Sequence, residues 1–292
     1  MNAVFNVYKP AGMTSNDVVA IMRKILNMKK IGHGGTLDPD ATGVLPVFTG
    51  TATRLLEFAV DGTKEYVAEF RLGKKTATGD ISGEVVETAA VPVFSKADLE
   101  IVLQKFLGKQ QQIPPMYSAI KVGGKKLYQL ARKGQEVERQ PRDIEIYDLE
   151  ILGFNPPDFR LRVECSKGTY IRTLGEDIAR ALGTVGTMTK LTRIRVGQFT
   201  LEDSHTLEEI KEKSEACVIE PLTAVNLPRL SLTAKQAYRV TSGVATTVRG
   251  TESGRYVALG PQSEFLGIVL AADEIVKAEK VLVRYENPEQ DQ

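Results

Sequence analysis

Residues 32–46 of this 292-residue chain are GHGGTLDPDATGVLP. The glycines let the backbone approach a ligand closely or take a positive φ, and Pro39 biases Asp38 towards an extended conformation. The wider region 31–50 follows neither a helical nor a strand period, which predicts one long structured loop. Loops of this kind often carry function, so Asp38 is a candidate functional carboxylate presented from a stiff segment.

Standard ligand-binding loops do not fit this stretch. It has no Lys-Ser or Lys-Thr at P-loop spacing, and Leu37 stands where the third glycine of a dinucleotide fingerprint belongs. A calcium loop fails because Thr49 replaces the bidentate glutamate. DPDAT at 38–42 resembles the nucleophile loop of Mg²⁺-dependent haloacid-dehalogenase-like phosphatases. Those enzymes place an apolar strand before the aspartate, which residues 33–37 cannot form, and the phosphatase is kept as an alternative.

Composition and length limit the class of protein. The chain is 42% hydrophobic and 26% charged, as in soluble globular proteins, and its length predicts about two domains. The longest apolar stretch, 265–272, is too short to span a bilayer. No secretory signal is visible, so a cytoplasmic protein is expected. Two cysteines, Cys165 and Cys217, and two histidines, His33 and His205, predict neither a zinc site nor a disulfide framework.

Charge is distributed unevenly along the chain. Residues 1–30 carry five basic side chains against one acidic, and residues 121–142 carry seven against two. Residues 160–195 carry eight against three, whereas 201–220 carry seven acidic side chains against two basic. Three basic segments on one face would attract a polyanion. Solvated surface charge is the alternative interpretation, and charge alone leaves it open.

Periodicity predicts a mixture of strands and helices. Strands are expected at 4–8, 65–71, 142–154 and 159–165, and helices at 15–25, 95–106 and 171–182, with caps at Ser15 or Asn16 and at Ser95. The order lacks a βαβ rhythm, which favours an α+β fold with a mixed, largely antiparallel sheet flanked by helices. The acidic stretch and Asn226-Leu227-Pro228 mark a boundary between domains 1–228 and 229–292. Strands expected at 255–259, 264–270 and 280–285 make the second domain small and β-rich.

Several motifs together resemble one family. The loop 32–46 matches the signature GHxGTLDPxATGVLP of TruB-class bacterial tRNA pseudouridine synthases, with Gly34 at a position where threonine is common. The same family order continues through YKPAGMTS at 8–15, KEY at 64–66, LGK at 72–74 with 76–83, QIPPMYSAIK at 112–121, CSKGTYIRTL at 165–174 and LTR at 191–193. This resemblance covers about residues 1–200 and implies the pseudouridine synthase fold. Beyond residue 230 it is to a short, variable PUA-like RNA-binding tail.

The resemblance also implies roles for particular residues. Asp38 would be the essential carboxylate, acting as a nucleophile or as a proton acceptor, and Arg172 its cationic partner. Tyr66 would stack on a flipped uracil. The resemblance leaves open whether Tyr66 also helps to remove the C5 proton. The remaining substrate-binding candidates are Tyr170 and Leu191 in the pocket, His33 in the space vacated by the base, and Lys9 and Lys64 in phosphate or structural contacts.

The implied reaction converts uridine 55 in the T loop of tRNA to pseudouridine. It needs no metal or other cofactor. The basic segment 121–142 would clamp the RNA, and a monomer without a protein partner is expected. The alternative from another class is a non-catalytic RNA-binding or tRNA-folding protein, in which the same site is only a pocket.

Overall fold

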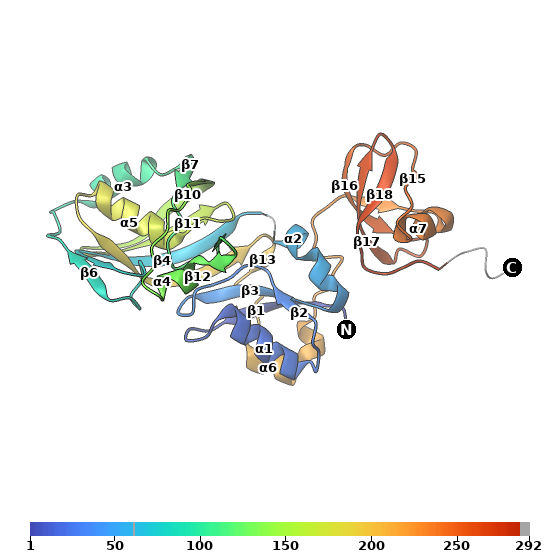
Figure 1. Cartoon of the computed structure of the whole chain (residues 1–292), viewed down its shortest axis with the longest axis horizontal. Coiled ribbons are helices and arrows are strands. Elements are labelled where there is room, and N and C mark those ends of the chain that lie inside the picture. The colour runs from blue at the N-terminus through green and yellow to red at the C-terminus, as the bar shows by residue number, and fades with distance from the viewer. Residues whose placement is uncertain (61, 287–292) are drawn as a thin grey trace.

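The computed structural model describes residues 1–60 and 62–286 (Figure 1). Within them, the main sheet has nine strands in the order β1-β3-β12-β4-β11-β10-β7, with β2 beside β3 and β13 beside β12. The strands are β1 Val4–Lys9, β2 Ile31–His33, β3 Thr42–Thr49, β4 Lys64–Leu72, β7 Gly108–Gln112, β10 Arg142–Asn155, β11 Asp158–Cys165, β12 Gly186–Val196 and β13 Phe199–Thr200. Two hairpins lie outside it, β5 Lys74–Thr76 with β6 Val85–Thr88, and β8 Lys121–Val122 with β9 Lys125–Lys126.

Most neighbouring strands in this sheet run antiparallel, and β12 with β3 is the parallel pair. The predicted α+β class with a mixed, largely antiparallel sheet is therefore confirmed. Helices in this part of the chain are α1 Ser15–Ile25, α2 Leu56–Ala59, α3 Lys96–Gln104, α4 Leu127–Ala131, α5 Ile171–Ala181 and α6 Leu207–Glu212, with the 3-10 helices η1 Gly50–Leu55 and η2 Ser214–Cys217.

Besides the apolar cluster that it shares with the C-terminal unit, the main sheet carries two apolar cores. One packs α3 and α5 onto β4, β10, β11 and β12, around Phe70, Leu161 and Ile178, and the other packs α1 and α6 against β1 and β3, around Phe5, Val18 and Leu45 (Figure 1). All three helical stripes expected from the sequence face these cores. Between the two cores, where β3, β12 and β4 meet, the strands carry residues 42–46 of the loop motif, KEY and LTR.

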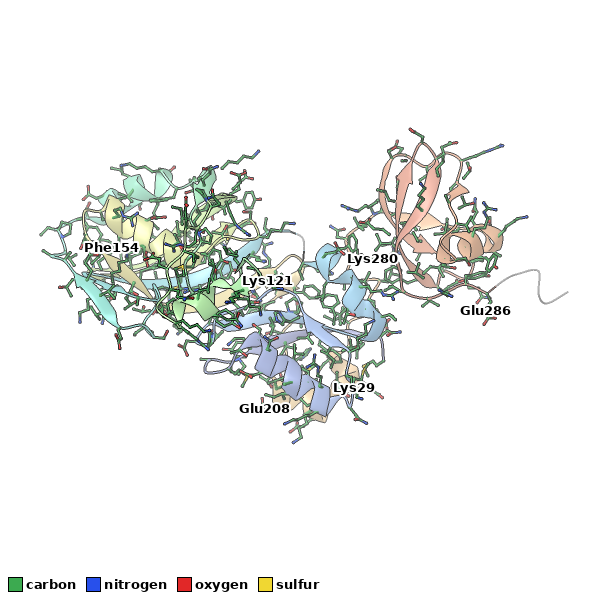
Figure 2. The ribbon with its side chains drawn as sticks, viewed as in Figure 1. Lys29, Lys121, Phe154, Glu208, Lys280 and Glu286 are labelled. Atoms are coloured by element: carbon green, nitrogen blue, oxygen red, sulfur yellow. The ribbon has the colours of Figure 1, made fainter. Side chains whose placement is uncertain are left out.

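A second, five-stranded sheet in the order β14-β16-β17-β18-β15 forms the C-terminal unit. It comprises β14 Arg229–Ser231, β15 Thr246–Thr247, β16 Gly254–Leu259, β17 Phe265–Ala272 and β18 Ile275–Val281, with helix α7 Ala234–Thr241. Val257 and Ile268 join an apolar cluster with Leu55 of η1. Lys280 also pairs with Glu57 of α2, at the junction seen in Figure 2.

The structure corrects several local predictions. The region 31–50 is not one loop, because β2 and β3 border the segment that carries Asp38. Helix α1 is capped by Thr14 in a capping box, instead of by Ser15 or Asn16. The strand expected at 280–285 is β18, which ends at Val281. Strands β7 and β12 and helix α7 were not expected at all.

The predicted domain boundary at 226–228 lies next to the first strand of the second sheet. The PUA-like character of 229–292 stays a prediction, and residues 287–292 of that predicted domain lie outside the described residues. None of the helices in the described part of the chain has the length and apolar character needed to cross a membrane.

Candidate active site

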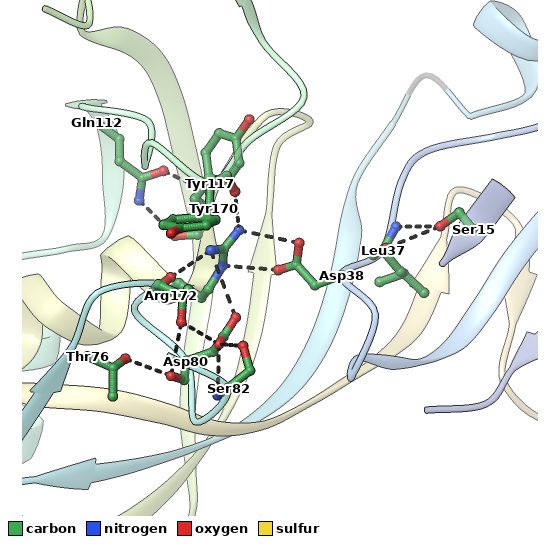
Figure 3. Close-up of polar contacts among 11 residues, drawn as sticks. Ser15, Leu37, Asp38, Thr76, Asp80, Ser82, Gln112, Tyr117, Tyr170 and Arg172 are labelled. Atoms are coloured by element: carbon green, nitrogen blue, oxygen red, sulfur yellow. Dashed lines mark hydrogen bonds and ion pairs between the residues drawn. The ribbon is translucent and has the colours of Figure 1, made fainter. Parts of the chain in front are cut away.

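Asp38 and Arg172 form a two-pronged ion pair, although 134 positions separate them (Figure 3). Arg172 Nε lies 3.0 Å from Asp38 Oδ2, and Nη2 donates to Oδ1 at 3.3 Å. The Arg172 side chain is 5% exposed and that of Asp38 35%. A planar guanidinium suits such a carboxylate because its fork offers two parallel donors. The partnership implied by the resemblance is present in the structure.

Arg172 is held from several sides. It lies in the first turn of α5, two positions after Tyr170. The Tyr170 backbone N–H donates to Gln112 Oε1 at 2.8 Å, and the Tyr170 carbonyl accepts from Gln112 Nε2 at 3.1 Å. Arg172 also donates to the Thr78 and Tyr117 carbonyls, each at 2.7 Å. These contacts fix the guanidinium, so the position of the carboxylate is fixed with it.

Asp80 adds a second negative charge beside Arg172. Its Oδ2 is 3.9 Å from Arg172 Nη1, while Oδ1 accepts hydrogen bonds from Thr78 and Ser82 (Figure 3). Sequence reasoning did not single out Asp80. The signal that could have found it is its place in the motif segment 76–83.

The loop that carries Asp38 is bound on both sides of that residue. Leu37 N–H donates to Ser15 Oγ at 2.9 Å. On the other side, the Pro39 carbonyl accepts from Gly12 N–H at 3.0 Å and from Lys9 Nζ at 2.9 Å. The segment YKPAGMTS is therefore next to Asp38 in space, and it holds the loop in place.

Burial is the largest influence on the pKa of Asp38 and raises it above its ordinary value. The Arg172 charge opposes this shift, and the nearby Asp80 carboxylate adds to it. Desolvation disfavours the charged form of a carboxyl group. Asp38 is consequently a stronger base than an exposed aspartate, while the ion pair with Arg172 fixes the orientation of its two carboxylate oxygens.

A cleft of about 350 Å³ opens beside this pair. Its wall includes Lys64, Tyr66 and Tyr170, and an adjoining hollow of about 90 Å³ is lined by Asp38, Tyr66, Tyr170 and Leu191. Two aromatic rings and one aliphatic side chain thus surround the carboxylate. Most small-molecule sites in proteins are concave and mostly apolar, whereas the residues that line this cleft are mostly charged or polar.

Burial raises the pKa of the Tyr66 phenol to about 12 and also raises that of Tyr170. Both side chains are therefore neutral phenols at neutral pH. They offer the cleft aromatic faces and hydrogen-bonding hydroxyl groups.

Two predicted binding residues lie outside the cleft lining. Lys9 is fully buried, and its ammonium donates to the Pro10 and Pro39 carbonyls, at 2.8 and 2.9 Å. This geometry fits the structural contact and not the phosphate contact. Burial lowers the pKa of Lys9 to about 8. His33 is half-buried on β2, next to the loop but not in the lining.

Other cleft residues were missed by the sequence reasoning. Arg193, Tyr117 and Ser118 line the cleft but were not named as candidates. They lie inside two quoted motifs, LTR and QIPPMYSAIK, so the motifs themselves were the signal. Lys121 and Arg142, the two ends of the predicted clamp, also line it, and Figure 2 places Lys121 near the centre of the molecule.

Comparison with known proteins agrees with this geometry. A model of the TruB family pseudouridylate synthase N-terminal domain matches residues 23–171, and one of the tRNA pseudouridylate synthase B C-terminal domain matches 172–228. The chain belongs to the TruB family. The pseudouridine synthase fold expected from the sequence is thereby confirmed, and membership in a family of pseudouridylate synthases argues against the phosphatase alternative.

Relatives of this TruB family chain extend over almost its whole length. Two proteins named tRNA pseudouridine synthase B, from Caldanaerobacter subterraneus subsp. tengcongensis and Heliobacterium modesticaldum, are 43% and 41% identical to it. The alignments cover 96% and 98% of this chain and 99% and 97% of those proteins. A namesake from Listeria innocua is 50% identical over 74% of this chain and 73% of its own length.

Solved structures share the fold. A structure of an H/ACA RNP bound to a substrate RNA containing 2'-deoxyuridine gives a TM-score of 0.74 at 26% identity, covering 97% of this chain and 86% of that one. A crystal structure of a Cbf5-Nop10-Gar1 complex gives 0.75 at 27% identity, covering 98% and 86%. The resemblance includes the C-terminal sheet, since nearly the whole chain is covered.

Proposed function

We propose that this protein is a tRNA pseudouridine synthase that isomerises uridine 55 of the T loop. The observation that carries the proposal is the Asp38–Arg172 pair, set at a cleft with aromatic walls. The curated relatives bear the name tRNA pseudouridine synthase B, which supports tRNA as the substrate. The position within tRNA follows from the family resemblance of the 32–46 loop.

The reaction breaks the bond between N1 of uracil and C1′ of the ribose, turns the base, and joins C5 to C1′. Asp38 is the anion that meets the sugar. It either attacks C1′, or it accepts a proton from C2′ so that a glycal forms. Both routes need an ionised carboxylate in the correct orientation, and the ion pair with Arg172 sets that orientation.

Stacking shields both reacting carbons, so the uridine must first leave the stack. Flipping a nucleotide costs a few kcal/mol and is easiest in a loop. Tyr66 stacks on the everted base, with Tyr170 and Leu191 completing the pocket. His33, which lies on β2 outside the cleft lining, would fill the space that the base vacates in the RNA.

The RNA is held by the basic segment 121–142, which includes β8, β9 and α4. The ends of this segment line the cleft, so a clamp here would close over the flipped nucleotide. The unit 229–292, which we take to be a PUA-like RNA-binding domain, would contact a further part of the tRNA. The enzyme acts as a monomer in the cytoplasm and requires no protein partner.

Asp38→Asn tests this function, and Asp40→Asn is its control because Asp40 is an exposed carboxylate in the same loop. Tritium release from C5-labelled tRNA should be abolished in Asp38→Asn and kept in Asp40→Asn, while both variants bind tRNA within about threefold of the natural protein, since the exposed contacts that dominate affinity are untouched. Mapping of pseudouridine in the treated tRNA identifies the position.

The alternatives give different results. A protein that only binds or folds RNA releases no tritium, with or without Asp38. A phosphatase releases phosphate in a reaction that EDTA stops. Turnover retained by Asp38→Asn would contradict the mechanism.

A further inference from the structure

Arg193 on β12 has the largest fully buried side chain in the described part of the chain, at 1% exposure. Its Nε donates to the Val44 carbonyl at 2.8 Å and its Nη2 to the Gly35 carbonyl at 3.0 Å. On the sheet, Arg193 is the register partner of Tyr66 on β4, and it hydrogen-bonds the phenol of that residue. One guanidinium therefore ties together the Asp38 loop, β3 and the aromatic wall of the cleft.

Arg193 differs from Arg172 in how its positive charge is balanced. Across residues 1–60 and 62–286 its polar partners are two main-chain carbonyls and a phenol, with no carboxylate ion pair. A buried charge without a counter-charge is costly, and burial lowers the pKa of Arg193. A guanidinium nevertheless stays protonated in proteins. The cleft wall thus keeps a positive charge that the protein itself does not compensate.

The position of this charge relates it to the reacting base. Arg193 lines the same cleft as Asp38 and Tyr66. A Cβ built on Gly35, the residue before Thr36 of the cleft lining, would lie 3.5 Å from Arg193 Nη1 and 3.6 Å from Lys64 Nζ, so two cationic groups lie close to this point of the Asp38 loop. Gly35 has a φ of +104° and no side chain that would contact these two groups. Since Arg193 and Lys64 both line the cleft, they place positive charge close to whatever enters it.

The proposed reaction creates a negative charge that needs such a partner. When the N1–C1′ bond breaks, both electrons leave with the base, which becomes a uracil anion with charge on N1, O2 and O4. At C1′ the electrons are replaced by a bond to Asp38, or by the C1′–C2′ π bond after the C2′ proton leaves. When C5 joins C1′, the bond between C1′ and Asp38 breaks, or, on the glycal route, Asp38 returns the proton to C2′. The C5 proton is then lost and N1 gains a proton, so the uracil anion exists only between the two bond changes.

We propose that Arg193 stabilises this uracil anion electrostatically from the cleft wall, and so speeds cleavage of the glycosidic bond. The inference rests on the proposed function and names a residue that acts on the base, whereas Asp38 acts on the sugar. Fixed positive groups aimed at developing charge in a site shielded from water are effective because they need no reorganisation during the reaction.

Arg193→Gln, which is neutral but keeps an amide donor for the carbonyls, and Arg193→Lys, which keeps the charge, form the test pair. Single-turnover cleavage by Arg193→Gln should be about 100-fold slower, the usual effect of losing one donor to a developing anion. Arg193→Lys should recover most of that loss. The control Lys190→Gln, which removes an exposed charge from the same strand, should leave the rate unchanged.

A second substrate separates electrostatic from structural loss. In tRNA with 5-fluorouridine at the target, fluorine already stabilises the departing anion, so the deficit of Arg193→Gln should shrink to about 10-fold. Equal deficits on both substrates, or full activity of Arg193→Gln, would overturn the inference. If the natural protein cleaves neither substrate, the proposed function itself fails. Binding of tRNA and thermal unfolding of each variant show whether it is folded.

Discussion

Replacement of Arg172 by lysine tests how much the active site depends on a fork-shaped cation. The guanidinium contacts the Asp38 carboxylate and the Thr78 and Tyr117 carbonyls at the same time. Lysine keeps the positive charge, but one compact ammonium cannot reach all three groups. The side chain is 5% exposed, so water does not readily replace the donors that are lost.

The size of the effect follows from these contacts. A hydrogen bond to a charged group contributes about 1.5 to 3 kcal/mol, and an unsatisfied buried carbonyl costs about 1 to 3 kcal/mol. Asp38 is 35% exposed, so the contribution of its ion pair with Arg172 to the free energy of unfolding must be reduced for solvent screening. We expect Arg172→Lys to lower the free energy of unfolding by about 3 kcal/mol. A misdirected carboxylate should also reduce kcat about 100-fold.

Urea unfolding and tritium release measure the two effects. Exposed Arg180, on the same helix, is the matched control, since Arg180→Lys keeps the charge at a side chain that is 70% exposed. Its unfolding free energy and kcat should stay close to those of the natural protein. An Arg172→Lys protein that matches this control in both measurements would refute the reasoning.

Three further outcomes follow from the same structure. Because burial raises the pKa of Asp38, kcat should fall as pH decreases through a midpoint above the ordinary value of 3.8; a pH–rate profile with no loss until below that value would contradict this. Lys9→Met removes the ammonium that donates to the Pro10 and Pro39 carbonyls, of which Pro39 keeps the Gly12 N–H, so urea unfolding should show a loss of about 1 to 3 kcal/mol. Its tRNA affinity should be unchanged, whereas a phosphate contact would weaken it. The basic segment 121–142 predicts that log Kd for tRNA rises steeply with log salt, and a flat salt profile in filter binding would argue against the clamp.

The sequence predicted those elements of this protein whose pattern depends only on their own residues. Each of these elements buries one face, and burial of one face imposes a period on the element's own apolar residues. The sequence therefore showed the alternation of apolar residues along β4, β10 and β11 and the apolar stripes of α3 and α5. Asp38 was found because its loop has an unusual composition, and its partner Arg172 was found through the family motif.

Other elements were missed because neighbours define them. Strand β12 lies between β3 and β4, and its two basic side chains differ in burial, since Arg193 is buried and Lys190 is exposed. Its polar and apolar residues therefore do not alternate cleanly along the strand. Two register shifts against β4 disturb the pattern further. Residues 42–49 were expected in a loop because of their Gly, Thr and Pro content, but pairing with β1 and β12 makes them a strand.

By itself the sequence determined the chemical groups of the site, the α+β class and the family, since these depend on residue types and their spacing. Only the tertiary structure decided which charges are paired. Arg172 meets a carboxylate, Arg193 meets carbonyls and a phenol, and Lys9 is turned inwards. All three are basic residues in quoted motifs, yet their energies differ because burial and partners, which the chain acquires only when distant segments pack, set the cost of a charge.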